Sequence, residues 1–296
     1  TNSSGVLQRI GLNALEATTS GDRNIAIGVD ALLTNTQGAR SVAIGYAALT
    51  AQNFTTDTEA YNIAIGYEAG GAVTFGTVNT LIGGLAGDAL TEGNNNVGVG
   101  YAALGSDTKG DRNISIGSGS LATQNFTTST DSYNVAVGHN AGNAVTTGIQ
   151  NTLIGGLAGD ALTDADFNVA LGYAALGADV KGSRTTAIGY GALAAQSFST
   201  GTNSDNTAVG YGSGVSITTG TNNTAIGALA LDAETVGARN VAVGYAALSD
   251  QVSSSGTGTY NTAVGHLAGE NITSGIQNTI IGGLAGDALT DADFNT

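Results

Sequence analysis

The chain lacks proline, cysteine, methionine and tryptophan, and only 8 lysines and arginines stand against 23 aspartates and glutamates in its 296 residues. Binding to nucleic acid or to an anionic membrane begins with cationic neutralisation of phosphate, so a formal net charge of −15 argues against both partners. No apolar run approaches the roughly 20 residues that span a bilayer. We expect no membrane insertion of this segment.

Catalytic chemistry also has little support. Without cysteine, and without a Ser-His-Asp set outside a repeat pattern, the chain offers no recognisable nucleophile for acyl transfer. Carboxylates that could form a glycosidase pair recur along the chain, whereas catalytic sites are usually singular. We therefore expect no enzyme and no cofactor. The absence of cysteine leaves the redox compartment open, although it is compatible with an extracellular location.

What the chain does contain is a repeat built on glycine, of which there are 47. Versions of Asn24-Ile25-Ala26-Ile27-Gly28 return sixteen times, at spacings of 17 or 21 residues. Their last glycines lie at 11, 28, 45, 66, 83, 100, 117, 138, 155, 172, 189, 210, 227, 244, 265 and 282. A short fixed period of this kind is typical of stacked supersecondary units. We predict an all-β fold, a parallel β-solenoid of about 16 coils in a single repeat domain over residues 1–296, and we interpret the chain as an internal slice of a longer fibre protein.

The motif alternates with the period of a β-strand. The residue before each glycine is Ile, Val or Leu, and the residue three before it is Ile, Val or Thr in every copy but the first. Side chains two apart share one face of a strand, so this face, with Val42 and Ile44, is predicted to form the solenoid interior. A second short strand after each glycine is expected to supply the opposite wall.

The residue between these two positions is Ala in ten copies. A strand that is apolar on both faces is buried on both faces, which predicts that other copies of the chain pack against this outer face. The predicted chain-chain interface consists of Ala26, Ala43, Ala64, Ala136, Ala187 and Ala242. The bulkier Leu81, Leu153 and Ile280 coincide with Gly84, Gly156 and Gly283 after the motif glycine, as if both positions filled one interchain space.

Two further rows are interpreted as architecture. Asn precedes the motif glycine by four residues in most copies, which fits a side chain that bonds turn backbone or stacks in a ladder. A second glycine, such as Gly38, stands seven residues before the motif glycine in eleven copies. This glycine is expected to provide a positive φ at a corner.

The 21-residue coils carry four extra residues in one place, which predicts loops on one edge of the solenoid. The inserted segments are 52–55, 124–127, 196–199 and 251–254. Phe54, Phe126 and Phe198 on the first three loops are candidate receptor contacts, being periodic aromatics on protruding segments. The alternative is that each Phe folds back and caps the edge.

Charged and titratable residues give weaker candidates. Clustered carboxylates could hold calcium, but their spacing matches neither an EF-hand loop nor a calcium β-roll, and a solvated acidic corner is the alternative. These acids are Asp160, Asp164, Asp166, Asp287, Asp291 and Asp293. His139 and His266 occupy a position that is usually Tyr, which indicates substitutions in a packing or surface row. Arginines at one shared position (Arg23, Arg40, Arg112, Arg184 and Arg239) are expected to form exposed ion pairs with Asp22, Asp107, Asp111 and Asp179.

The motif resembles the head repeats of trimeric autotransporter adhesins (YadA-like heads), which occur also in bacteriophage tail fibres. The resemblance rests on Asn24–Gly28, Ser41–Gly45 and Asn240–Gly244, each followed by a small residue three further on. It implies three parallel chains, each a left-handed β-roll. It also implies an extracellular fibre, on a cell surface or as a virion appendage, that attaches to a host-surface or matrix ligand.

Two other interpretations stay open from the residues. The first is a purely structural filament or sheath without a receptor. The second is ice binding, which requires a flat, regular array of Thr. In this chain, Thr occurs at the position three before the motif glycine and in the irregular inserts, so the sequence shows no such array.

Overall fold

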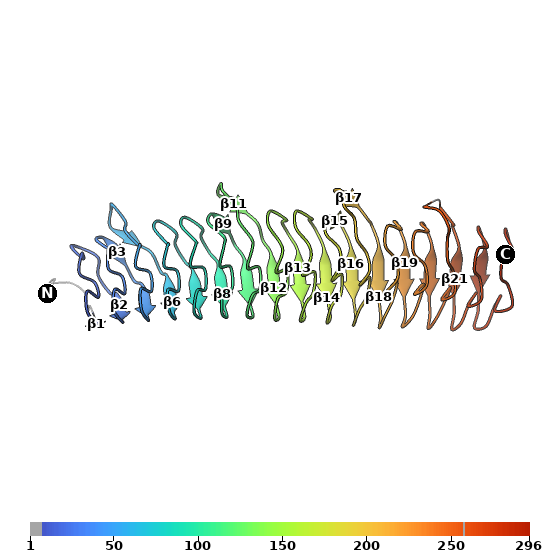
Figure 1. The fold of residues 1–296 in the computed structure, drawn as a ribbon, viewed down its shortest axis with the longest axis horizontal. Helices are drawn as coiled ribbons and strands as arrows, with labels where there is room; N and C mark the ends of the chain where they lie inside the picture. Colours follow the sequence, from blue (N-terminus) through green and yellow to red (C-terminus); the bar gives the residue numbers. More distant parts are fainter. Residues whose placement is uncertain (1–7, 257) are drawn as a thin grey trace. The chain divides into compact units, whose positions relative to one another are not determined.

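The computed structural model describes residues 8–256 and 258–296, which form strands and turns and contain no helix. The chain forms two compact units, Thr1–Ile149 and Gln150–Thr296. In each unit, eight copies of the motif form eight three-residue strands, one per coil, and these pair in parallel (Figure 1). The predicted parallel β-solenoid of about sixteen coils is confirmed.

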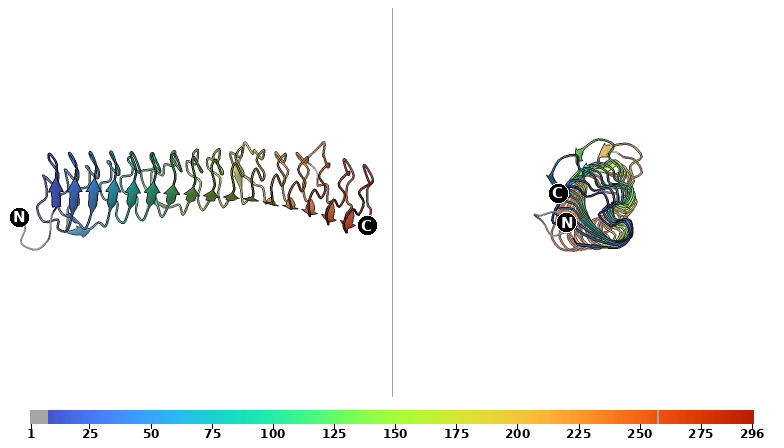
Figure 2. Two further views of the ribbon diagram at one scale, coloured as in Figure 1. Left: turned by 90° about the horizontal axis from the view of Figure 1, so that it is seen from below. Right: turned by 90° about the vertical axis from the view of Figure 1, so that its left-hand side faces the viewer.

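The motif strands lie one behind the next along one wall of the coils in each unit (Figure 2). In the first unit they are β1 (Gln8–Ile10), β2 (Ile25–Ile27), β4 (Val42–Ile44), β6 (Ile63–Ile65), β7 (Thr80–Ile82), β8 (Val97–Val99), β10 (Ile114–Ile116) and β12 (Val135–Val137). In the second unit they are β13 (Thr152–Ile154), β14 (Val169–Leu171), β16 (Thr186–Ile188), β18 (Thr207–Val209), β19 (Thr224–Ile226), β20 (Val241–Val243), β21 (Thr262–Val264) and β22 (Thr279–Ile281).

The register of the sheet places each motif residue beside its own counterpart. Ala26 lies beside Ala43, and Ala43 lies beside Ala64 although four more residues separate this second pair. The inserted residues therefore leave the sheet undisturbed. They lie among short two-residue strands at the loop edge: β3 (Gly38–Ala39), β5 (Thr58–Glu59), β9 (Gly110–Asp111), β11 (Thr130–Asp131), β15 (Gly182–Ser183) and β17 (Thr202–Asn203).

The two faces of the motif strands are the reverse of those predicted from the sequence. From β2 onward the middle residue of each motif strand points inward and is buried within the single chain, as Ala43 is, whereas Val42 and Ile44 on either side remain partly exposed. The predicted interface residues Ala26, Ala43, Ala64, Ala136, Ala187 and Ala242 are all 0% exposed. This assignment was wrong, because side chains that fill a chain's own core cannot contact another chain.

The core is too thin for two facing rows of large side chains. Small motif residues such as Ala43 face leucines from the opposite wall, including Leu32 and Leu49, and all three are fully buried. Where the motif carries Leu81, the opposite position is Gly87, and a Cβ added there would lie 2.7 Å from Leu81 Cδ2. A bulky motif residue is therefore matched by a glycine inside the same chain, and not by space between chains, as a core of fixed width requires.

The opposite wall consists of turns rather than the predicted second strand. After the motif glycine, some backbone N–H groups donate to the carbonyl oxygen three residues earlier, and others donate to a carbonyl oxygen of the next coil. Thus Leu33 N donates to Asp30 O at 3.3 Å, and Leu32 N to Ala48 O at 3.0 Å. Leu32 has a φ of 51°, a left-handed conformation that costs a non-glycine residue roughly 1–2 kcal/mol. Coil-to-coil hydrogen bonds and leucine burial offset that strain.

The buried asparagines join successive coils, as predicted. Asn62 Nδ2 donates to Gly76 O at 2.8 Å, and Asn62 Oδ1 accepts from Asn79 N at 3.0 Å. Asn79 repeats both bonds one coil later, to Gly93 O and from Asn96 N. Each asparagine thus satisfies backbone groups in a corner that water does not reach.

Two rows of glycine are required for different reasons. The motif glycine adopts a φ near 140°, as at Gly28 (139°), where side chains are strained. The corner glycine was expected to need a positive φ, but Gly76 is not among the residues with one. A Cβ at Gly76 would instead overlap the carbonyl of Gly93 in the next coil, so close approach of backbone is the reason for glycine here.

Ala64→Asp and Ile65→Asp test the corrected face assignment within one strand. Asp at 64 would place an unpaired carboxylate in the core, and we expect a loss of about 4 kcal/mol or more with collapse of the β-type circular dichroism. Asp at 65 points outward and should keep the β spectrum, with a loss of about 1 kcal/mol or less in the stability of the single chain. Urea denaturation of both variants measures the difference, and the opposite ranking would contradict the assignment.

Candidate functional site

The inserted loops extend beyond the neighbouring coils at the edge that carries β3, β11 and β17 (Figure 1). Their phenylalanines do not face solvent. Phe54, Phe126 and Phe198 are only 5–7% exposed, so the prediction that they contact a receptor was wrong and the capping alternative holds. Phe54 also packs edge-on against Phe75, with ring centroids 6.2 Å apart. Burying an aromatic ring at the open edge stabilises the loop more than displaying it would.

Each inserted loop lies on a buried polar network that the sequence analysis missed. The first residue of the insert is Gln, and its amide Nε2 donates to a residue seventeen positions earlier, at 2.7 Å for Gln124 and Asp107. The Oε1 of the same Gln124 accepts from Asn134 Nδ2 at 2.9 Å. The acid also accepts from loop backbone, since Asp107 Oδ1 lies 3.1 Å from Gly110 N and 3.2 Å from Phe126 N.

The same network recurs at all four inserts with different acceptors. The pairs are Gln52 with Asn35 (3.3 Å), Gln124 with Asp107 (2.7 Å), Gln196 with Asp179 (2.6 Å) and Gln251 with Glu234 (2.8 Å). In coils that neither carry nor directly precede an insert, apolar side chains such as Val73 and Leu90 occupy the equivalent buried position. The signal was present in the sequence, because Gln opens every insert and Asn, Asp or Glu precedes it by seventeen residues.

Exposed charges at the loop edge form pairs with partners other than those predicted. Arg40 contacts Glu59 at 2.6 Å and lies over the Tyr61 ring, 5.4 Å from its centroid. Arg112 repeats this arrangement with Asp131 and Tyr133.

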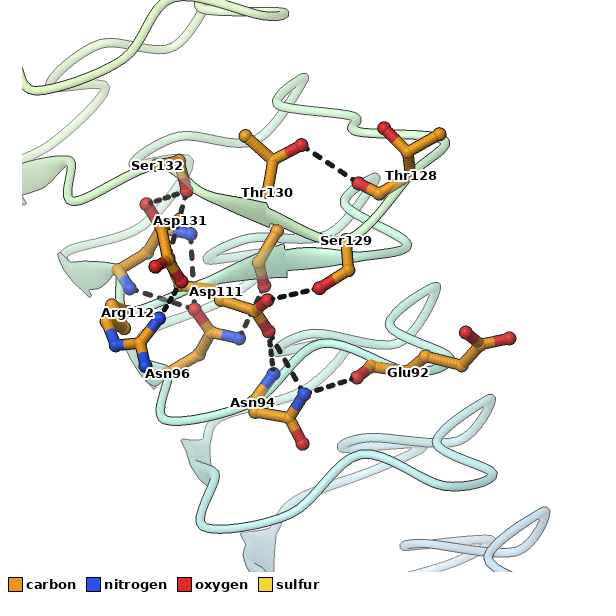
Figure 3. A network of polar contacts seen from close by, with 12 residues as sticks. Glu92, Asn94, Asn96, Asp111, Arg112, Thr128, Ser129, Thr130, Asp131 and Ser132 are labelled. Atoms are coloured by element: carbon orange, nitrogen blue, oxygen red, sulfur yellow. Dashed lines mark hydrogen bonds and ion pairs between the residues drawn. The ribbon is translucent and has the colours of Figure 1, made fainter.

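Of the acids named from the sequence, only Asp22 pairs with an arginine, at 3.9 Å from Arg23. Asp107 and Asp179 are buried in the Gln networks. Asp111 accepts from Asn94 N and from Ser129 (Figure 3). Exposed ion pairs such as that of Arg40 contribute little to stability.

A row of exposed tyrosines follows the motif glycines. Tyr46 and Tyr67 are stacked with ring centroids 5.4 Å apart, and Tyr190 stacks on Tyr211 at 5.5 Å. His266 takes the place of tyrosine in this row and stacks on Tyr245 at 5.4 Å. The tyrosine rings are about half exposed, so the row forms a surface of ring edges and hydroxyl groups.

The six aspartates considered for calcium are not gathered into a site. Among the described residues, no three His, Cys, Asp or Glu side chains come together where they could hold a metal ion. Asp164 pairs with Lys181 at 3.3 Å, and Asp293 Oδ1 accepts from Ile276 N at 2.8 Å. Burial raises the pKa of Asp160 above its ordinary value.

The described part of the chain also holds no helix long and apolar enough to cross a membrane. Comparison with protein-family models, with curated proteins and with solved structures found no match in any of the three. The surfaces of this chain must therefore be interpreted from their own chemistry.

Asp107→Asn tests the buried network through pH. Burial raises the pKa of Asp107, so its contribution to stability is present below the ordinary carboxyl pKa and is lost as the pH rises through the raised value. Asn35, the natural counterpart, makes comparable bonds to Gly38 and Gln52 without a charge. We expect the melting temperature of the variant relative to the parent to be higher at neutral pH than near pH 4. A difference that does not change with pH would contradict this assignment.

Proposed function

We propose that this chain is a section of an extracellular fibre in which three copies associate side by side, and that the fibre mediates attachment to a host surface or matrix. The observation that carries the proposal is the outward face of the motif strands. Ile, Val and Thr side chains occupy this face from coil to coil, and several, such as Ile63, Ile114 and Ile226, are 37–40% exposed. A sheet face that meets water usually alternates to polar residues, whereas most outward residues of the motif strands here are Ile or Val.

The magnitude of the exposed face favours association. Full burial of such a side chain contributes roughly 1.5–3 kcal/mol, so covering the exposed part of each returns about 1 kcal/mol. Two outward residues on each of eight strands in one unit give a gain on the order of 10 kcal/mol before association costs. None of the outward positions on the motif strands from β2 to β22 carries a charge, so no ionised group on this face would need to lose its hydration.

The adhesive role is assigned to a different surface. In this proposal the stacked tyrosines take the part first given to the phenylalanines. Tyr46, Tyr67, Tyr190 and Tyr211 present ring edges and hydroxyl groups to solvent, and tyrosine provides large contact area at low conformational cost in binding surfaces. The second candidate is a structural filament without a receptor, which the regular repetition of every surface row favours.

Ile116→Lys tests the association. Light scattering of the parent chain should give three times the chain mass, and Lys at this outward position should release monomers because it places a cation in an apolar seam. Circular dichroism should stay unchanged, since the residue lies outside the core. Thr56→Lys, at an exposed position directly after the first inserted segment, is the matched control and should leave the mass unchanged. A parent chain that remains monomeric at every concentration would contradict the proposal.

A bead-binding assay distinguishes an adhesive fibre from a purely structural filament. Beads are coated with the trimeric chain. The beads are offered to cultured animal cells, bacterial cells and immobilised matrix proteins. Adhesion that falls when Tyr67 and Tyr211 are both replaced by Ser, with the trimer intact, supports the tyrosine surface. Absence of adhesion to every probe favours the filament.

A further inference from the structure

The amide of Gln196 is enclosed by a hydroxyl group, a carboxyl group and a second amide. Its Nε2 lies 3.0 Å from the hydroxyl oxygen of Thr185 and 2.6 Å from Asp179 Oδ2. Its Oε1 accepts from Asn206 Nδ2 at 2.8 Å. Ser204 Oγ lies 2.5 Å from Thr185 Oγ1. All five side chains are at most 1% exposed, so a hydroxyl nucleophile, an amide and a carboxyl group share one dry site.

We propose that Thr185 and Gln196 react to form an intramolecular ester bond, with Asp179 and Asn206 promoting the reaction. The bond formed joins Thr185 Oγ1 to the amide carbon Cδ of Gln196, and the bond broken is Cδ–Nε2. The hydroxyl proton leaves with the nitrogen, so one molecule of ammonia is released. No oxidant or cofactor is needed, because no atom changes its oxidation state.

Each neighbour has a role that its position permits. Asn206 donates to the oxygen on which negative charge develops during attack, as a donor of an oxyanion hole does. Asp179 accepts from the departing nitrogen and holds the amide in place. Ser204 lies 2.5 Å from the attacking hydroxyl and orients it, and the hydroxyl proton passes to Nε2, which lies 3.0 Å from Thr185 Oγ1. Thr185 Oγ1 lies 3.0 Å from Gln196 Nε2, and rotation of the amide about its Cγ–Cδ bond would turn the face of the amide carbon toward this oxygen. Exclusion of water protects the ester from hydrolysis.

Each of the three other inserts lacks the acid, the close hydroxyl or both, and together they serve as internal comparisons. Gln52 lies 3.3 Å from the Ser41 hydroxyl, but the neutral Asn35 replaces the acid. Gln251 has Glu234, but its hydroxyl partner Thr259 is farther away, at 3.4 Å.

Gln124 keeps the acid, but no hydroxyl lies against its amide. Among the described residues, the only acceptor for Gln124 Nε2 is Asp107. The residue equivalent to Thr185 in that coil is Asn113. Only the coil of Gln196 combines the close hydroxyl with the acid.

The ester would join the start of strand β16 to the first residue of the inserted loop in the same coil. The chain has no cysteine, so a disulfide cannot supply such a link. A covalent closure inside the coil would hold the loop in place when the coil-to-coil hydrogen bonds open. It would act whether or not the chain assembles into a trimer or adheres to a surface.

Intact-mass spectrometry of the denatured full chain tests the proposal. We expect the folded chain to lose the mass of one ammonia on incubation. Chymotrypsin cleavage after Tyr190 should leave residues 185 and 196 on two fragments that remain joined. Hydroxylamine, which cleaves esters, should separate them. A chain that keeps its full sequence mass, or an ammonia loss that maps elsewhere, overturns the proposal.

Two control variants use residues that the same fold already accepts at equivalent positions. Thr185→Asn copies Asn113 and should abolish the mass loss, whereas Thr185→Ser should retain it. Asp179→Asn copies Asn35 and should slow the loss at least tenfold. Unchanged circular dichroism shows that each variant folds. Loss of ammonia that persists in Thr185→Asn contradicts the assignment of the nucleophile.

The converse variant is Asn113→Thr, which places a hydroxyl beside Gln124 and Asp107. We expect a new loss of ammonia between residues 113 and 124 in this folded variant. If the folded variant does not gain this link, a hydroxyl, a glutamine amide and an acid in this arrangement are not enough to form the ester, which contradicts the proposal.

Discussion

In-register stacking of coils is the constraint on which the rest of the structure depends. Because the parallel ladder places Ala26 beside Ala43 and Ala43 beside Ala64, every side chain has its own counterpart as a neighbour about 4.8 Å away. Like charges at that spacing repel, which fits a chain in which only 10% of residues are charged. Asparagine and tyrosine tolerate this spacing, since amides bond to amides and rings stack on rings. The surface rows are thus a consequence of the backbone register.

The thinness of each coil decides which side of the strand is the interior. A period of two shows that residues alternate between faces, but it does not show which face is inside. Hydrophobicity alone favours Ile44 over Ala43, and that argument failed because the turn wall already supplies Leu32 and Leu49. Two large rows would overfill the space. The indication in the sequence was the leucine or glycine four residues after each motif glycine, which fills the core jointly with the motif residue.

Period, parallel register, asparagine ladder and position of the inserts could all be predicted, because they follow from regular spacing. The loop contacts could not, since they depend on the direction of single side chains. Phe126 on an insert suggests display, yet an open solenoid edge presents apolar surface that a ring can cover. The Gln networks were also missed, because polar residues in a loop are ordinarily solvated. Here the corner that they occupy is closed to water.

The buried acids and the inserts explain each other. An insert brings loop N–H groups into a dry corner, where each unpaired donor would cost about 1–3 kcal/mol. Asp179 accepts from Gly182 N and Phe198 N at 3.1 Å, as well as from the Gln196 amide. In coils that neither carry nor directly precede an insert, an apolar residue such as Ile217 fills the position. The same requirement that places an acid beside a glutamine amide, out of contact with water, also creates the conditions in which that amide can react.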